Sequence, residues 1–202
     1  MLDVLRRRGL AATFFVVGQR LEQPECRELA ERAVAEGHWI GNHTYTHSMP
    51  LGLIEDAATA RDEIERTQDL IGKLSHPDRL FRPFGGGGHL NQNLLSRAAV
   101  EHLIAGRYTC VTWNAVPRDW EDPDGWAERA VAQCREAETA LLVLHDLPTG
   151  AMAHLERFLD LAAHAGATFT QTLPDAGVLI RRGKIQGTLD GLVAGESSVR
   201  AR

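Results

Sequence analysis

The sequence predicts an α/β fold in which parallel strands alternate with helices, and three observations lead to this prediction. Short apolar runs recur along the chain and alternate with longer segments of helical periodicity. Chemically versatile polar residues stand directly after several of the apolar runs, as they do at the carboxyl ends of parallel strands. The length of 202 residues, with 44% hydrophobic and 24% charged residues, is typical of a single globular domain.

The first half of the chain supplies three expected strands and three expected helices. Residues 12–17 (ATFFVV) are continuously apolar or β-branched, which is typical of a buried parallel strand. Pro24 in the first turn and Gly37 at the end bound a helix over 24–36. A longer helix over 55–74 has one apolar face. The remaining expected elements are a helix over 2–9 and strands over 38–42 and 80–83.

The second half continues the alternation. Helices are expected over 94–105, 122–134 and 152–165, and strands over 108–113, 141–144 and 168–170. The pattern fades after Pro174. We therefore expect one domain over residues 1–180 and a loosely structured C-terminal tail over 181–202.

Composition narrows the function classes. The net charge of −5, from 22 basic and 27 acidic residues, argues against a nucleic-acid partner. No apolar run approaches the roughly 20 residues of a membrane span.

Three cysteines (Cys26, Cys110 and Cys134) without a CxxC spacing predict small buried side chains rather than disulfides or an all-cysteine zinc site. Met1 leads directly into the first helix without a signal peptide, which predicts a cytoplasmic protein for the sequence as written. The oligomeric state is not predicted.

His43 and His47 are the first candidate functional residues. Two imidazoles at i and i+4 on a helical turn face the same way and can share one metal ion. With nine histidines in the chain, about 0.4 such pairs arise by chance, so two unrelated surface histidines are the alternative. Their place after an expected strand favours a ligand pair.

Three further positions follow expected strands. His145 ends the apolar run 140–144 and is placed for acid–base chemistry, or is a histidine bonded to backbone at the core edge. Arg82 precedes a proline and a run of glycines, which can bring backbone N–H groups to a ligand or form a simple flexible loop. Asp119 and Trp120 can orient a histidine and line a sugar site, or form a turn beside a packed indole.

Taken in order, these segments resemble the polysaccharide deacetylase family, the NodB-homology domain of the carbohydrate esterases. Residues 12–18 (ATFFVVG) resemble the ATFFvvG strand of that family, and 37–47 (GHWIGNHTYTH) its H-[S/T]-x-x-H motif. Residues 81–86 (FRPFGG) resemble R-P-P-Y-G, 113–120 (WNAVPRDW) the motif ending in Asp-Trp, and 142–145 (LVLH) the L-x-L-H motif. The resemblance covers residues 1–173.

The resemblance implies a distorted (β/α) barrel, a divalent metal, usually Zn²⁺, and hydrolysis of N-acetyl or O-acetyl groups on a carbohydrate polymer. It makes His43 and His47 metal ligands, His145 the general acid, Asp119 the support of His145, and Arg82 the residue that orients a catalytic carboxylate. Gly85, Phe84 and Trp120 then line the substrate site, with Gly85 at the position of the family's tyrosine.

One departure concerns the family's first motif, T-F-D-D-G, which supplies an aspartate base and a third metal ligand. This sequence contains no such motif, and Asp3 falls in the helix that follows it in the family. A barrel without its first strand is therefore expected. A misassigned start codon, a truncated gene and a homologue that has lost activity are three explanations, and we favour the first.

Two other functions stay open. The same fold can hydrolyse small cyclic amides or imides, so the partner is an acetylated glycan or a small amide. A non-catalytic carbohydrate-binding protein would keep Trp120 without needing the missing aspartates.

Overall fold

The computed structural model describes residues 1–195, which form two compact units, each described here by itself. We call residues Thr13–Thr112, together with residues 178–195, the sheet unit. Residues Met1–Ala12 and Trp113–Gly177 form the helical unit. Neither unit is a continuous stretch of sequence, because the chain passes from one to the other three times.

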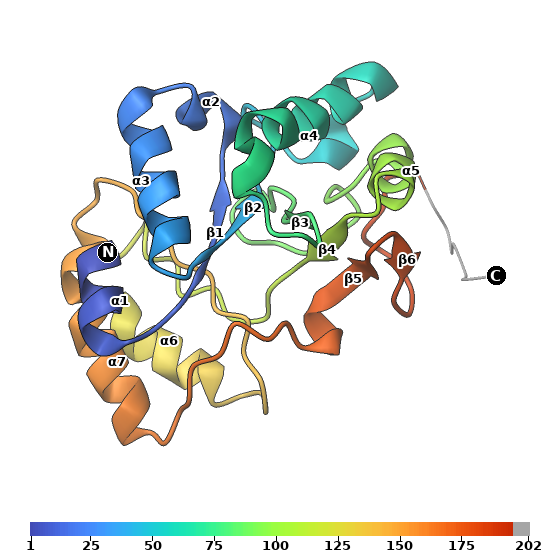
Figure 1. The fold of residues 1–202 in the computed structure, drawn as a ribbon. Coiled ribbons are helices and arrows are strands. Elements are labelled where there is room, and N and C mark those ends of the chain that lie inside the picture. The colour runs from blue at the N-terminus through green and yellow to red at the C-terminus, as the bar shows by residue number, and fades with distance from the viewer. Residues whose placement is uncertain (196–202) are drawn as a thin grey trace. The chain divides into compact units, whose positions relative to one another are not determined.

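The sheet unit is built on six strands that lie in sequence order (Figure 1). They are β1 (Thr13–Val16), β2 (Trp39–Asn42), β3 (Leu80–Phe81), β4 (Thr109–Val111), β5 (Val178–Arg181) and β6 (Lys184–Ile185). Strands β1 to β4 pair in parallel, whereas β5 and β6 are antiparallel. The predicted α/β fold with parallel strands is thus confirmed, and the antiparallel hairpin is an addition that the sequence pattern did not indicate.

The helices described in the sheet unit are α2 (Gly18–Leu21), α3 (Pro24–Ala35), α4 (Ala57–Ile71) and α5 (Arg97–Ala105), with 3₁₀ turns η1 (Leu51–Leu53) and η2 (Gly72–Leu74). Two of these helices, α4 and α5, begin at a residue whose side chain caps the helix. The side chain of Asp56 accepts the backbone N–H of Thr59 at 2.7 Å, which satisfies one of the donors that a helix N-terminus leaves open. Both α3 and α4 pack against β2 (Figure 1).

The core of the sheet unit requires glycine at one point in β2. A Cβ at Gly41 would lie 2.7 Å from the ring of Phe15 on β1 and 3.1 Å from Leu80 on β3. The absence of that atom allows the Phe15 ring to lie across the sheet, where it reaches a candidate site residue described below.

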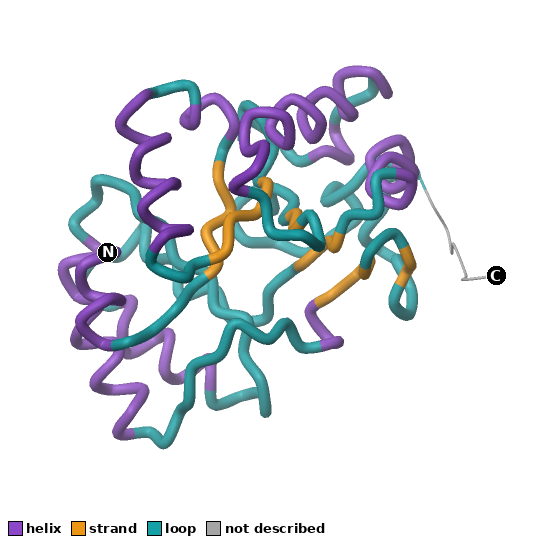
Figure 2. The backbone as a smooth tube through the Cα atoms, viewed as in Figure 1, coloured by secondary structure: helices purple, strands orange, loops and turns teal. Residues whose placement is uncertain are grey.

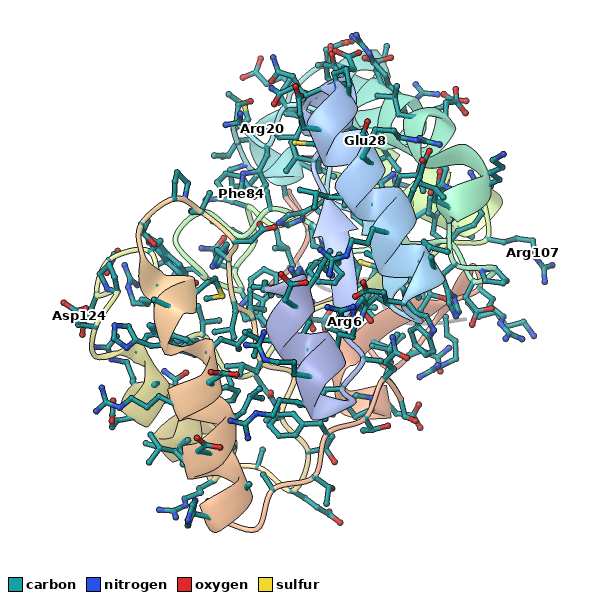
Figure 3. All side chains as sticks on the ribbon, turned by 60° about the vertical axis from the view of Figure 1, so that its left-hand side comes forward. Arg6, Arg20, Glu28, Phe84, Arg107 and Asp124 are labelled. Atoms are coloured by element: carbon teal, nitrogen blue, oxygen red, sulfur yellow. The ribbon has the colours of Figure 1, made fainter. Side chains whose placement is uncertain are left out.

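The helical unit has α1 (Leu2–Arg8), α6 (Trp126–Cys134) and α7 (Leu155–His164), with 3₁₀ turns η3 (Ala151–His154) and η4 (Asp175–Gly177). Its core centres on Trp126, which is fully buried and donates its indole N–H to the carbonyl of Ala151 at 2.8 Å. Basic residues at the end of α1, the helix that carries Arg6 in Figure 3, pair with acidic residues of α7: Arg7 with Glu156 and Arg8 with Asp160.

Two predicted strands are wrong as regular elements, and both are loop in Figure 2. Among the described residues, 141–144 make one bridge, between Ala115 and Leu142, and the backbone N–H groups of Leu141 and His145 donate to side chains instead of to a neighbouring strand. Residues 168–170 are irregular: the Thr170 hydroxyl accepts the backbone N–H of Thr172, a local bond that competes with a strand ladder.

The C-terminal segment is more ordered than expected as far as it is described. Within the predicted tail over 181–202, β6 pairs with β5, and Val193 forms a parallel bridge with Leu95. Leu189 and Val193 are only 3% and 2% exposed. Residues 196–202 lie outside the described part of the chain.

None of the helices within residues 1–195 combines the length and apolar character needed to cross a bilayer. The three cysteines are free thiols, of which Cys110 is buried while Cys26 and Cys134 are partly exposed.

Candidate functional site

In the sheet unit, the loop after β2 brings His43 and His47 together. Their Nε2 atoms lie 3.1 Å apart and their ring centroids 4.6 Å apart. The predicted convergence of the two imidazoles is therefore present.

The predicted helical turn at this place is wrong. Residues 43–47 have no helical backbone, and Thr44 and His47 adopt left-handed conformations with φ of 66° and 52°. Such φ values are uncommon for residues other than glycine and for β-branched residues above all. The imidazoles therefore meet because the loop is folded back on itself, and the i,i+4 spacing has a different structural basis from the one predicted.

The ring of His43 is held in an orientation that suits a metal ligand. Its Nδ1 lies 2.6 Å from the carbonyl oxygen of Arg82, so Nδ1 carries the proton and donates it there. Nε2 then presents its lone pair. Histidine ligands are commonly oriented by a hydrogen bond of this kind from the other ring nitrogen.

The pair fits a divalent cation as two of its ligands. Two nitrogens at the usual Zn–N distance in a tetrahedral site are about 3.3 Å apart, close to the separation seen here. Within residues 1–195 no group of three or more histidine, cysteine or acidic side chains is placed to hold a metal ion. The described residues thus supply two ligands, and water or another donor would fill the other positions.

Arg82 follows β3, and its guanidinium lies over the ring of Phe15, with Cζ 4.4 Å from the ring centroid. No carboxylate or other acceptor from residues 1–195 contacts this guanidinium, in contrast to Arg79, which donates to the Gly106 carbonyl and the Tyr108 hydroxyl. Burial lowers the pKa of Arg82 to about 10. The group is still charged at neutral pH and is partly exposed, so the fold carries a partly desolvated cation whose partner among the described residues is an aromatic face.

We expect Arg82→Met to raise the free energy of unfolding at pH 7. A pKa lowering of this size corresponds to a cost of about 3 kcal/mol, and the lost contact with Phe15 offsets part of the gain, which leaves a net stabilisation of about 1–2 kcal/mol. Because the folded-state pKa is the lower one, the cost is present below pH 10 and declines as the pH rises above it. Urea unfolding of the variant measures the change.

Arg79→Met serves as the matched control for this prediction. It removes a cation whose N–H groups have two acceptors, so it should lower stability. Arg82→Met unfolding at lower urea than the parent chain would contradict the prediction.

Phe84 and the glycines after it lie next to the histidine pair. The ring of Phe84 is 4.2 Å from that of His47, centroid to centroid, so it packs on a candidate ligand. Gly85 accepts the backbone N–H of His89, which closes a tight loop in which Gly86, Gly87 and Gly88 all have positive φ. The assignment of Phe84 and Gly85 to substrate binding stays a prediction.

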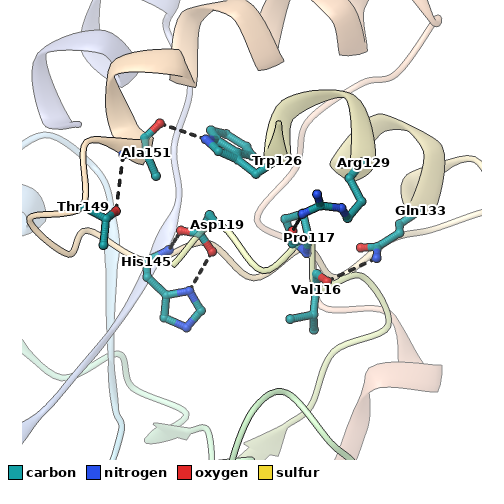
Figure 4. Close-up of polar contacts among 9 residues, drawn as sticks. All are labelled: Val116, Pro117, Asp119, Trp126, Arg129, Gln133, His145, Thr149 and Ala151. Carbon is teal, nitrogen blue, oxygen red and sulfur yellow. Dashed lines mark hydrogen bonds and ion pairs between the residues drawn. The ribbon is translucent and has the colours of Figure 1, made fainter. Parts of the chain in front are cut away.

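In the helical unit, Asp119 and His145 form a pair joined by two hydrogen bonds (Figure 4). One carboxylate oxygen lies 2.9 Å from Nδ1 of His145, and the other accepts the backbone N–H of His145 at 2.8 Å. The Asp119 side chain is 1% exposed and that of His145 is 28% exposed. The predicted support of His145 by Asp119 is thus geometrically in place.

Hydrogen bonds of the main chain explain why His145 lies next to Asp119. Residues 141–143 bond to the segment 114–115: Val143 donates to Ala115, and Ala115 donates to Leu141. Asn114 adds two side-chain bonds, to Leu141 and Thr139. Two residues after Val143, the backbone N–H of His145 donates to the Asp119 carboxylate and not to a backbone carbonyl. The hydrogen bonds between these two segments therefore place the imidazole beside the aspartate.

Trp120 lies against the other side of the imidazole. Its ring and that of His145 meet edge to face, with centroids 4.7 Å apart. Arg118 lies over the indole at 5.5 Å and pairs with Glu121. The structure thus gives Trp120 a packing contact with the candidate acid, and its predicted role in binding sugar is untested.

Sequence reasoning missed the residues that hold these loops. On α6, Arg129 donates to the Pro117 carbonyl and Gln133 to the Val116 carbonyl, which fixes the loop that carries Asp119 (Figure 4). On α4, Glu63 accepts hydrogen bonds from the loop between His43 and His47. A signal existed for Glu63, since it falls on the same helix face as the buried residues Ala60, Ile64 and Thr67.

Comparison with known sequences gives consistent matches. The polysaccharide deacetylase family model matches residues 1–102. A chitooligosaccharide deacetylase of Sinorhizobium fredii is 29% identical over 192 residues, covering 90% of this chain and 81% of the relative. A peptidoglycan-N-acetylmuramic acid deacetylase of Bacillus subtilis is 30% identical over 151 residues, covering 73% of this chain and 29% of the relative. Similarity thus spans most of this chain, but only part of some relatives.

Solved structures of similar fold have related descriptions. A family 4 carbohydrate esterase from Streptomyces lividans, in complex with acetate, is 30% identical with a TM-score of 0.67 and covers 88% of this chain and 86% of its own. An acetyl xylan esterase from Clostridium thermocellum, with a cobalt ion, is 26% identical with a TM-score of 0.65, covering 84% and 78%. A pseudoenzyme of carbohydrate esterase family 4 from Bacillus anthracis is 20% identical with a TM-score of 0.65, covering 83% and 56%, which shows the fold alone.

Proposed function

Because the chain belongs to the polysaccharide deacetylase family, we propose that it hydrolyses N-acetyl groups of an acetylated glycan. Relatives named for chitooligosaccharide and peptidoglycan substrates support a polymer of N-acetylated amino sugars. In this reaction water adds to the acetyl carbonyl carbon, the C–N bond breaks, and the nitrogen gains a proton as acetate leaves.

The observation that carries this proposal is the pair of hydrogen bonds that joins Asp119 to His145. Asp119 accepts the Nδ1–H of His145, which leaves Nε2 to exchange a proton with substrate. The second bond, to the backbone N–H of His145, keeps the residue from rotating away. A protonated His145 held in this way is suited to donate its Nε2 proton to the departing nitrogen.

His43 and His47 are the residues that would hold a divalent cation, for which Zn²⁺ is our choice. Such a cation, when bound, polarises an acetyl carbonyl and lowers the pKa of its water. The chain's own contribution is to keep the two Nε2 atoms 3.1 Å apart, with the His43 tautomer fixed by the Arg82 carbonyl.

A second candidate function is glycan binding without hydrolysis. Two observations favour it. Among residues 1–195, no third metal-ligating side chain lies beside the two histidines, and no carboxylate of those residues contacts the Arg82 guanidinium. A protein of this kind would retain Trp120 beside His145 as an aromatic surface for sugar.

Acetate release separates the two functions. The purified chain is incubated with Zn²⁺ and either chitooligosaccharide, peptidoglycan fragments, acetyl xylan or a cyclic imide, and free acetate or ring opening is measured. We expect acetate from the N-acetylated glycans. Glycan binding without acetate release would support the second function, and ring opening of the imide alone would replace the proposed substrate class.

A further inference from the structure

A buried carboxylate on α4 organises the loop that carries the histidine pair. Glu63 is 9% exposed. Its Oε2 accepts the backbone N–H groups of Tyr45 and Thr46, both at 2.9 Å. Its Oε1 accepts the hydroxyl of Thr46 at 2.8 Å. Three donors from two consecutive residues thus converge on one side chain 17 to 18 positions away in sequence.

These contacts account for a backbone that the loop would not adopt by itself. Successive N–H groups that point to one side form an anion-binding concavity when a residue nearby is left-handed, and Thr44 and His47 are both left-handed. The Glu63 carboxylate fills that concavity. An ionised acceptor makes stronger hydrogen bonds than a neutral one, so it can stabilise φ values that non-glycine residues avoid.

The two imidazoles depend on Glu63 to different degrees. The His43 ring has its own support, the carbonyl of Arg82. His47 directly follows Thr46, which donates both its backbone N–H and its hydroxyl to Glu63. Loss of the carboxylate should therefore displace the backbone at His47, even though its ring packs on Phe84, and leave His43 in place.

We propose that Glu63 is the positioning residue that brings His47 Nε2 to His43 Nε2 and thereby sets the affinity of the pair for a divalent cation. The role in cation affinity rests on the proposed function, whereas the role in placing His47 does not. Glu63 acts through the loop and touches neither imidazole in the contacts described above.

The test compares Glu63→Gln with Glu65→Gln, an exposed glutamate on the same helix, as the matched control. Glutamine has one acceptor oxygen in place of two, so it cannot satisfy the same three donors. In the metal-free protein, NMR should show ring-to-ring NOEs between His43 and His47 in the parent chain and in Glu65→Gln. We expect these NOEs to disappear in Glu63→Gln. Their persistence would overturn the proposal.

The second measurement is Zn²⁺ affinity by competition with a chromophoric chelator. We expect the Kd to rise by about 10–100-fold in Glu63→Gln, the usual effect of removing an outer support of a ligand, and to be unchanged in Glu65→Gln. Lost NOEs with an unchanged Kd would overturn the role in cation affinity. A parent chain that binds no Zn²⁺ would refute the metal site of the proposed function, and the NOEs would still decide the placement of His47.

Thr46→Val covers the case in which Glu63→Gln fails to fold. Thr46 is exposed, and the change removes one of the three bonds while keeping the β-branched shape. We expect a rise in Kd of about 2–10-fold with weaker NOEs. Parent-like NOEs and affinity in Thr46→Val, together with an unfolded Glu63→Gln, would assign Glu63 to stability alone and so contradict the proposal.

Discussion

His145→Ala is expected to lower the turnover of an N-acetylated glycan by about 10²–10⁴-fold, the usual contribution of a positioned general acid. The reason is the bonding of His145: Asp119 holds its Nδ1, so the residue's exchangeable proton is at Nε2. The Zn²⁺ content of the variant should equal that of the parent chain, because the proposed ligands are His43 and His47 whereas His145 is bonded to Asp119. Acetate release and elemental analysis give the two readouts.

His154→Ala is the matched control, since His154 is also a histidine of the helical unit that pairs with an aspartate, here the 94% exposed side chain of Asp124 (Figure 3). Exposed pairs of this kind contribute little. Its turnover should match that of the parent chain. If His145→Ala retained parent-like turnover, the dyad would have no part in the proposed reaction.

His47→Ala is expected to abolish both Zn²⁺ binding and turnover. Its Nε2 lies 3.1 Å from that of His43, and a single imidazole without its partner is a weak site. We expect Zn²⁺ affinity to fall by more than about 100-fold, above the loss that follows removal of an outer support. Isothermal titration with ZnCl₂ measures the affinity, and acetate release the turnover.

His164→Ala controls for the loss of any one histidine, because that side chain is exposed and its hydrogen bond is local, to the Asp160 carbonyl. It should bind Zn²⁺ as the parent chain does. Full Zn²⁺ affinity in His47→Ala would remove His47 from the metal site and leave the pair without a function.

Local sequence patterns were sufficient to predict the parallel strands and the helices beside them. The apolar run before Gly18 predicts β1, and Pro24 with Gly37 predicts α3 almost to the residue, because these signals act over a few neighbouring positions. The hairpin of β5 and β6 was missed although β5 is as long as β1 and β2, because it follows the irregular segment after Pro174. Its turn uses Arg182 in a left-handed conformation, which no local pattern announces.

The residues of the candidate site could be predicted from the sequence, but the contacts that hold them in place could not. Motif order identified His43, His47, Asp119 and His145, and the structure joins them in two pairs. What holds each pair is distant in sequence: Glu63 for the loop after β2, and Arg129 with Gln133 for the loop of Asp119. A charged residue on the buried face of a helix was the available signal, and only tertiary structure shows which donors it satisfies.

The interleaving of the two units along the chain governs the order in which they can fold. Residues 1–12 leave the ribosome before the sheet unit is made, yet their packing partners in α6 and α7 follow more than a hundred residues later. Likewise β4 obtains its neighbour β5 only after the whole helical unit has been synthesised. The helical unit therefore cannot be completed before Gly177 has emerged, nor the sheet unit before β5 and β6 have followed it. A gene fragment that ends at residue 112 would therefore encode neither folding unit in full.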